Sequence, residues 1–350
     1  MKRSVLTASL LAAVLGLAAC GQGEQSAETA ATDGGVVNLY TARHYDSDLM
    51  LYENFTEQTG IRINRIEGNA DQLLARMQAE GESSPADVFV TADAGALWRV
   101  QNAGLLQPTN SETLNAAIPA NLRDPEGRWF GFSRRARVVA YDPARVQPAD
   151  IDTYEDIASP RFRGQLCVRS ADSVYNLSLV GALIEAWGPE RAQQWVEGVV
   201  ANMARPPEGG DRDQILAVAA GVCQIALTNS YYFIRLASGD DAADREIAGK
   251  LRLGFPSLDG QGAHVNISGG GVAANAPNRA NAVRLLEYLA SPEAQTLVSQ
   301  HNNEYPASPN VPAPAPVDAY ADFQAHPMSV AAYGPRQAEA LAMMSAAGWR

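Results

Sequence analysis

Tyrosines that follow predicted strands are the residues of this sequence best placed to do chemistry. Tyr231 and Tyr232 are adjacent in "LTNSYYFIRL", after the apolar stretch "GVCQIAL"; Tyr175 and Tyr45 follow the predicted strands "QLCVRS" and "VVNLYTA". Neighbouring side chains of a strand point to opposite faces, so adjacent tyrosines reach one site only where the chain has left the strand. We predict that it leaves at about Ser230 and that both hydroxyls face one cleft. The alternative is one packed ring and one hydrated ring.

A cluster of phenols suits a hard and strongly acidic cation. Hard cations prefer oxygen ligands, and a phenol with a pKa of about 10 binds at neutral pH only if the cation displaces its proton. Fe³⁺ is acidic enough to do this, whereas Ca²⁺ and Mg²⁺ favour carboxylates and carbonyls. Three phenolates balance Fe³⁺, and a fourth leaves one negative charge.

Arginines in the neighbouring motifs offer a counter-charge for such a cluster. Arg43, Arg135 and Arg235 lie close in sequence to the predicted strand ends or to the adjacent extended segment. As donors behind the ligands they would offset the extra negative charge. The structural alternative is an ordinary ion pair for each arginine, and for each single tyrosine a packed ring with a hydrated hydroxyl.

Strands and helices alternate along the chain, which predicts mostly parallel sheets flanked by helices. The alternation runs over residues 36–104 and restarts at about 154, with two strands expected in 128–142. Extended segments near 132–141 and 264–274 predict two hinge crossings between two α/β lobes. Ligands of such sheets bind outside the carboxyl ends of the strands, where the four tyrosines stand. The predicted N-terminal lobe is 36–133 plus 270–310, and the C-terminal lobe is 134–269 plus 311–350.

The N-terminus has the pattern of an export signal. "MKR" precedes an apolar run too short for a confident membrane span, and the run ends in "LAAC", which resembles the lipobox of bacterial lipoproteins. That resemblance implies a signal peptide at 1–19, acylation of Cys20 and a polar tether over 20–35. The alternative is a signal peptide without lipid, cleaved nearby. Either way we expect an exported, periplasmic protein, and the lipobox adds a membrane anchor.

Composition limits the function classes further. The 350 residues are 46% hydrophobic and 19% charged, which suits two globular domains. The formal net charge of -12 argues against a nucleic-acid partner. No CxxC or HExxH zinc motif and no convincing Ser/His/Asp set occurs. "SGGGV" at 268–272 lacks a Walker-type lysine, so it predicts a hinge or a close approach of backbones.

Two cysteines remain in the exported chain. Cys167 precedes Tyr175 by the same interval as Cys223 precedes Tyr231. If the two strands are neighbours in register, a disulfide would join them and the tyrosines would emerge side by side. Two free buried thiols are the alternative.

Taken together, these segments resemble one family, the bacterial extracellular solute-binding proteins that carry ferric iron. The resemblance is to the branch with "RHY" after the first strand and spans about residues 36 to 310. It rests on "LYTARHYDSD", "FSRRARV", "RFRGQLCVRS", "VYN", "TNSYYFIRL", "HVNISGGGV" and "NNEYP". By this match Tyr45, Tyr175, Tyr231 and Tyr232 align with iron-ligating tyrosines, and His44 aligns with a position that ligates in some members only.

The resemblance implies a two-lobed periplasmic-binding-protein architecture without catalytic activity. The implied ligand is Fe³⁺, and the implied partner is an ABC permease of the inner membrane, to which a monomeric, lipid-anchored binding protein delivers the ion. Three alternatives remain open. The first is a binding protein for thiamine, a polyamine or an oxyanion; the second is a ligand-sensing partner of a membrane receptor. The third is an enzyme with a tyrosinate-bound iron centre, which would need an open coordination position.

Overall fold

The computed structural model describes residues 34–43 and 45–350. The predicted signal peptide, the tether with Cys20, and His44 therefore lie outside the described residues. Within the described part, no helix has the length and apolarity needed to cross a membrane.

The first part of the described chain alternates strands and helices as predicted. Its elements are β1 (Val36–Thr41), α1 (Asp46–Thr59), β2 (Arg62–Glu67), α2 (Ala70–Glu80), β3 (Val88–Thr91), α3 (Ala94–Asn102) and α4 (Glu112–Ala117). Strand β1 lies between β2 and β3 and is parallel to both. Helix α1 ends where Gly60 adopts a left-handed φ of 71°, which a residue without a Cβ adopts at little cost. The carboxyl ends of β1 and β3 therefore meet at one edge of the sheet.

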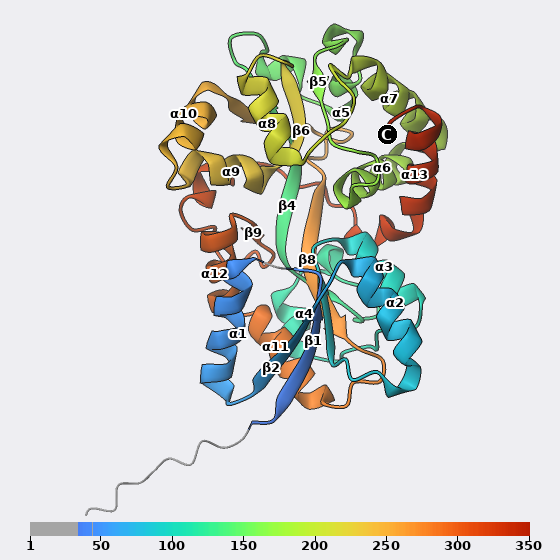
Figure 1. Ribbon diagram of the computed structural model, residues 1–350, viewed down its shortest axis with the longest axis vertical. Coiled ribbons are helices and arrows are strands. Elements are labelled where there is room, and N and C mark those ends of the chain that lie inside the picture. Colours follow the sequence, from blue (N-terminus) through green and yellow to red (C-terminus); the bar gives the residue numbers. More distant parts are fainter. Residues whose placement is uncertain (1–33, 44) are drawn as a thin grey trace, which may run out of the picture. The chain divides into compact units, whose positions relative to one another are not determined.

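Two long strands join this sheet to the next one (Figure 1). Strand β4 (Phe130–Tyr141) pairs through residues 130–136 with β8 (Val265–Val272), and through 137–141 with strands of the second half. The prediction of two strands in 128–142 is wrong: β4 is one strand with a register shift between Gly131 and Ser133. After Ser133 the strand contains none of the Gly, Pro, Asn, Asp or Ser residues that favour turns. The expected pair of extended crossings is confirmed.

The three consecutive glycines of β8 let this strand fit between β3 and β4. A Cβ at Gly270 would lie 2.7 Å from the carbonyl oxygen of Phe89. At Gly269 and Gly271 it would come still closer to carbonyl oxygens, those of Phe130 and Arg128. The close approach of backbones expected for this motif is confirmed.

The second half repeats the alternation. Its elements are α5 (Tyr154–Ile157), β5 (Leu166–Cys167), α6 (Val174–Trp187), α7 (Pro189–Asn202), α8 (Asp211–Ala219), β6 (Ile225–Asn229), α9 (Ser230–Ser238), α10 (Ala242–Lys250) and β7 (Arg252–Gly254). Strands β5 and β6 are parallel neighbours, and β4 pairs antiparallel with β6 and β7. The sequence predicts the parallel pair, whereas the antiparallel ones arise because β4 continues from the first sheet into the second. Cys167 and Cys223 form the predicted disulfide, with Cα atoms 5.9 Å apart.

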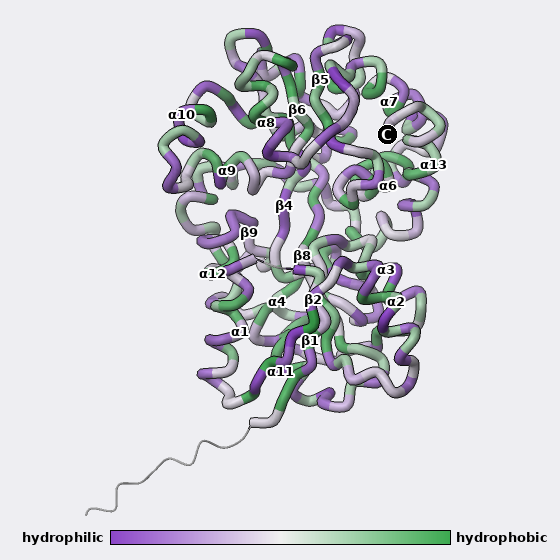
Figure 2. The backbone as a smooth tube through the Cα atoms, viewed as in Figure 1, coloured by the Kyte–Doolittle hydropathy of each residue, from purple (hydrophilic) through white to green (hydrophobic). Residues whose placement is uncertain are grey.

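The remaining chain returns to both halves. It contains α11 (Arg279–Leu289), α12 (Pro292–Asn302), β9 (Tyr305–Pro306) and α13 (Gln337–Ala346). Short 3-10 turns lie at Gly81–Ser83, Ala120–Leu122, Pro148–Asp150, Pro160–Phe162, Val317–Tyr320, Val330–Ala332 and Gly334–Arg336. Helix α13 lies beside α6 (Figure 1). Apolar and polar stretches alternate along the strands and helices (Figure 2), and separate buried clusters form around β1 and around β6.

Candidate functional site

The adjacent tyrosines begin a helix directly after a strand. Strand β6 ends at Asn229 and α9 begins at Ser230, as the sequence predicts. Successive residues of a helix are rotated by about 100°, so neighbours can face one site, which they cannot in a strand. The ring centroids of Tyr231 and Tyr232 are 4.3 Å apart. Tyr231 is buried and Tyr232 is half-buried.

Tyr175 reaches the same place from another helix. It lies in the first turn of α6, after the loop that follows β5. Its hydroxyl oxygen lies 3.1 Å from that of Tyr231, a hydrogen-bond distance in which either oxygen can donate. The disulfide between Cys167 and Cys223 joins β5 to the segment leading into β6. The two strands that precede these phenols are therefore covalently tied.

Tyr45 approaches the cluster from the first half of the chain. It is the residue before α1, and it is half-buried. The Arg235 guanidinium lies 5.8 Å from the ring centroid of Tyr45 and 5.8 Å from that of Tyr231. Burial, and then Glu304, raises the pKa of Tyr45, whereas Arg43 and a hydrogen bond with Tyr231 lower it by less. The structure thus brings all four predicted tyrosines into one neighbourhood.

The phenols raise one another's pKa values. Burial, and then the neighbouring Tyr175, raises the pKa of Tyr232 to about 12. Burial, followed by Tyr175 and Tyr45, raises the pKa of Tyr231 well above its usual value. Burial and Tyr45 likewise raise the pKa of Tyr175. The metal-free cluster is therefore protonated at neutral pH, and only a strongly acidic cation would bind it as phenolates.

Two of the three arginines predicted to lie behind the ligands, Arg43 and Arg235, are also bound to other side chains. Arg43 pairs with Asp48 at 2.9 Å and with Glu304 at 3.5 Å, and its guanidinium lies 5.1 Å from the Tyr45 ring centroid. Arg235 donates to the side-chain oxygen of Asn302 at 2.8 Å. Arg43 thus forms the expected type of ion pair and also contacts a predicted ligand.

The third predicted arginine is buried in strand β4. Arg135 is 1% exposed, donates to the Ser268 hydroxyl at 3.2 Å and to the Ala92 carbonyl, and lies 5.6 Å from the Tyr175 ring centroid. All three predicted arginines therefore reach the tyrosine cluster.

Sequence reasoning missed a buried ion pair and a further carboxylate at this site. The Arg169 guanidinium lies 5.2 Å from the Tyr175 ring centroid, and its partner Asp211 is fully buried between Arg169 at 3.6 Å and Arg137 at 2.6 Å. Arg169 stands at the end of the segment predicted as a strand, so the rule that led to the tyrosines could also have found it. Glu304 is the other omission, because "NNEYP" alone indicates only a loop.

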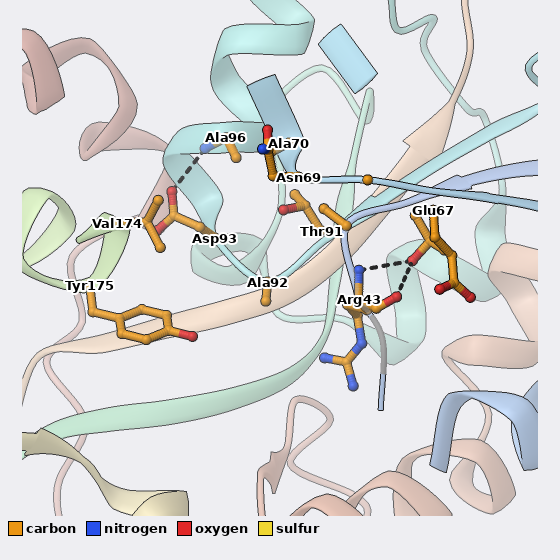
Figure 3. Close-up of a pocket in the computed structure, with 13 residues that line it drawn as sticks. Arg43, Glu67, Asn69, Ala70, Thr91, Ala92, Asp93, Ala96, Val174 and Tyr175 are labelled. Carbon is orange, nitrogen blue, oxygen red and sulfur yellow. Dashed lines mark hydrogen bonds between the residues drawn. The ribbon is translucent and has the colours of Figure 1, made fainter. Parts of the chain in front are cut away.

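A cleft of about 460 Å³ opens beside Tyr175 (Figure 3). Tyr175 lies on its α6 side and Arg43 on its β1 side. Helices α2 and α3 begin at its edge, where Asn69 and Asp93 are the capping residues. The Asn69 and Asp93 side chains accept from backbone N–H groups in the first turns of these helices. The cleft therefore adjoins the phenol cluster through Tyr175 and is lined by charged side chains of both signs, Arg43, Glu67 and Asp93.

The tyrosines have no rival metal site in the described part of the chain. Among residues 34–43 and 45–350, no group of three or more His, Cys, Asp or Glu side chains is arranged to hold a metal ion.

Residues 50–325 match the family described as bacterial extracellular solute-binding protein. The chain belongs to this family. It is 45% identical over 323 residues to iron uptake protein A2 of Synechocystis, a match that covers 92% of each protein. A Trichodesmium protein (IdiA, FutA) in complex with iron and citrate is 50% identical, with a TM-score of 0.86 over 90% of this chain and 100% of that one. A ferric binding protein from Campylobacter jejuni is 35% identical, with a TM-score of 0.85 over 90% and 100% of the two chains.

Membership of this family identifies the general class of protein to which the chain belongs. The family consists of solute-binding proteins, which confirms the prediction of a binding protein rather than an enzyme. The structural agreement over nine-tenths of the chain confirms the predicted two-lobed α/β architecture.

Proposed function

We propose that this protein captures ferric iron in the cleft between its lobes and delivers it to an ABC permease. The proposed ligands are the phenolate oxygens of Tyr45, Tyr175, Tyr231 and Tyr232. His44, which precedes Tyr45, is proposed as a further donor. The named relatives support the choice of ion, because they are an iron uptake protein, a complex with iron and citrate, and a ferric binding protein.

One observation carries the proposal. The Tyr175 and Tyr231 hydroxyls lie 3.1 Å apart, so one cation can contact both oxygens without a large rearrangement. Tyr232 stacks near Tyr231, and Arg235 lies against the rings of both Tyr45 and Tyr231. Four phenolates and Fe³⁺ carry one negative charge, which Arg43, Arg135 and Arg235 offset.

The lobes and the anchor complete the proposal. The N-terminal lobe comprises 36–133 plus 270–310 and supplies Tyr45; the C-terminal lobe comprises 134–269 plus 311–350 and supplies the other three tyrosines. The mature chain begins at an acylated Cys20, and the tether at 20–35 holds the monomeric protein near the permease. Its location is then the periplasmic face of a membrane.

The direct test is a titration of the purified mature protein with ferric citrate. Phenolate-to-iron charge transfer gives a visible absorption band, which a binder of thiamine, a polyamine or an oxyanion lacks. The Tyr231→Phe, Tyr232→Phe double variant should lose most of this band and bind iron far more than tenfold more weakly, because two anionic donors are gone.

A matched control separates ligation from packing. Tyr288→Phe removes the hydroxyl of a buried ring on α11, outside the cluster, and should leave colour and affinity as in the wild type. Full colour and unaltered affinity in the double variant would refute the site. A colourless wild-type protein would refute the proposed ion.

A further inference from the structure

Glu304 is a buried carboxylate that the proposed ligand set does not use. It is 1% exposed and follows Asn303, which ends α12 in the left-handed conformation with φ 60°. One of its oxygens, Oε1, accepts from the Asn302 side-chain amide at 2.6 Å and from the Arg43 guanidinium at 3.5 Å. The other, Oε2, accepts from the hydroxyls of Ser268, at 3.0 Å, and Ser133. Four donors therefore converge on one charged group.

These donors lead to the phenol cluster by three routes. Arg43 lies 5.1 Å from the Tyr45 ring centroid. Asn302 accepts from Arg235 at 2.8 Å, and Arg235 lies 5.8 Å from the rings of Tyr45 and Tyr231. The third route passes through the Ser268 hydroxyl, which accepts from Arg135 at 3.2 Å; Arg135 in turn lies 5.6 Å from the Tyr175 ring centroid. Glu304 thus connects Arg43, Arg135 and Arg235, the three arginines that the sequence predicts behind the ligands.

The same carboxylate is bound to both crossing strands. Ser133 belongs to β4, which pairs in both sheets, and Ser268 to β8, its antiparallel neighbour and the other crossing strand. A change in the crossing strands and a change around Tyr45 therefore act on one group. No other carboxylate in residues 34–43 and 45–350 is hydrogen-bonded to side chains of both β4 and β8.

The environment keeps Glu304 charged. Burial disfavours the anion, but Arg43, Arg135 and the two serine hydroxyls outweigh it and hold the pKa of Glu304 below its usual value. If the Glu304 carboxylate were removed, the buried groups that now donate to it would lose their acceptor. A neutral amide in its place would present hydrogen-bond donors to some of the groups that now donate.

We propose that Glu304 is a positioning residue for iron capture: it fixes Arg43 and Arg235 against Tyr45 and ties them to both crossing strands. This inference rests on the proposed function. Glu304 does not contact the ion; it acts through Tyr45, the one proposed phenolate ligand that the first lobe supplies. Its loss should therefore loosen the closing of the cleft onto iron and leave the three second-lobe phenols in place.

The test compares Glu304→Gln with Glu287→Gln in the full mature protein loaded with ferric citrate. Glu287 is a half-buried carboxylate on α11 that accepts from the Ser111 hydroxyl at 2.6 Å, so its variant makes the same chemical change away from the cluster. Iron loss to excess citrate should be at least tenfold faster in Glu304→Gln and unchanged in Glu287→Gln. Equal rates in both variants would overturn the inference.

A double-mutant cycle distinguishes positioning from general destabilisation. In a Tyr45→Phe background the Glu304→Gln change should alter the iron-loss rate by less than twofold, because the group it acts through no longer ligates. A tenfold effect that persists without the Tyr45 hydroxyl would overturn the inference. Colour in the wild type during the same assay shows separately that the proposed function holds.

If Glu304→Gln fails to fold, Ser268→Ala provides a second variant for the same iron-loss measurement. This change cuts the route from Glu304 to Arg135 and one tie to β8, while the carboxylate retains its contacts with Arg43, Asn302 and Ser133. We expect a threefold or greater rise in the iron-loss rate relative to the wild type. An unchanged rate in Ser268→Ala would contradict the proposed connection between the crossing strands and the site.

Discussion

The hydroxyl oxygens of Tyr175 and Tyr231 lie 3.1 Å apart although the residues are 56 positions apart in the chain. Each stands in the first turn of a helix that follows a strand, and the two strands are parallel neighbours. Parallel pairing sends both chains out at the same sheet edge, so the helix starts deliver both phenols to one point. The contact is a direct consequence of the β–α order of the second half.

Proton release should report how many phenols bind the ion. The raised pKa values keep the metal-free phenols protonated at neutral pH, so each ligating tyrosine must lose its proton. Iron affinity should therefore rise with pH, and acid should release iron. Tyr231→Phe should release one proton fewer per ion in an indicator titration, and Tyr288→Phe the same number as the wild type. Equal release from Tyr231→Phe and wild type would remove Tyr231 from the ligand set.

The metal-free protein should lose stability in alkali. Tyr232 has a pKa of about 12 in the folded protein, above the value of about 10 for a phenol in an unfolded chain. Because the folded pKa is the higher one, this contribution to stability is complete below pH of about 10 and is lost as the pH rises toward 12. Urea midpoints over this range should fall more steeply for the wild type than for Tyr232→Phe. Parallel curves would contradict the raised pKa.

Tyr45→Phe should separate the contributions of the two lobes. Tyr175, Tyr231 and Tyr232 all follow strands of the second half and remain in place without the Tyr45 hydroxyl. Iron should then bind more weakly, with a shifted charge-transfer band, in a protein whose lobes stay further apart. Small-angle scattering of the iron-loaded variant should give a larger radius of gyration than that of the loaded wild type. Identical radii would show that Tyr45 does not draw the lobes together.

Loss of the disulfide should affect both stability and iron retention. The bond between Cys167 and Cys223 closes a 56-residue separation and ties β5 to β6. The Cys167→Ser, Cys223→Ser variant should be less stable in urea by about 2–4 kcal/mol, the usual range for such a bond. It should also lose iron faster, because the freed strands lead into the two helices that carry three of the proposed ligands. A stability loss without faster iron loss would restrict the bond to a structural role.

Much of this architecture is predictable because it depends on local patterns. The β–α alternation, the two extended crossings and the end of β6 near Ser230 all follow from periodicity and from what adjacent side chains can reach. The disulfide follows from equal spacing to Tyr175 and Tyr231 in an exported chain. The continuity of β4 was missed because its arginines look like surface residues, yet Arg135 and Arg137 are each 1% exposed.

The groups behind the tyrosines are harder to predict because their partners are remote in sequence. Glu304 and Arg43 pair across 261 positions, and Asp211 joins Arg137 and Arg169 from a third segment. No local spacing encodes such meetings. They follow from the crossing of β4 and β8, which only the folded chain defines.

The membrane anchor is testable independently of the site. Cys20→Ser should block acylation, so the exported protein should appear in the soluble fraction after osmotic shock instead of sedimenting with membranes. Iron colour and affinity should match those of the wild type, because the cleft lies in the folded domain. Membrane association of Cys20→Ser equal to that of the wild type would show that "LAAC" is not a lipidation site.

A second buried carboxylate, Asp93, should make Ser178 important for stability. Asp93 caps α3 and accepts from the Ser178 hydroxyl at 2.7 Å, from Asn266 at 2.8 Å and from Gln337 at 3.0 Å. Ser178→Ala removes one donor from a buried charge, which costs about 1.5–3 kcal/mol for a hydrogen bond to a charged group. Urea unfolding should show this loss without any change in iron colour, because the Ser178 hydroxyl is hydrogen-bonded to Asp93 and Gln337 and to none of the tyrosines. Ser238→Ala is the control, since its exposed hydroxyl bonds only to the Ile234 carbonyl of its own helix at 2.8 Å, and it should cost far less. Equal midpoints for the two variants would mean that the remaining donors satisfy Asp93 without Ser178.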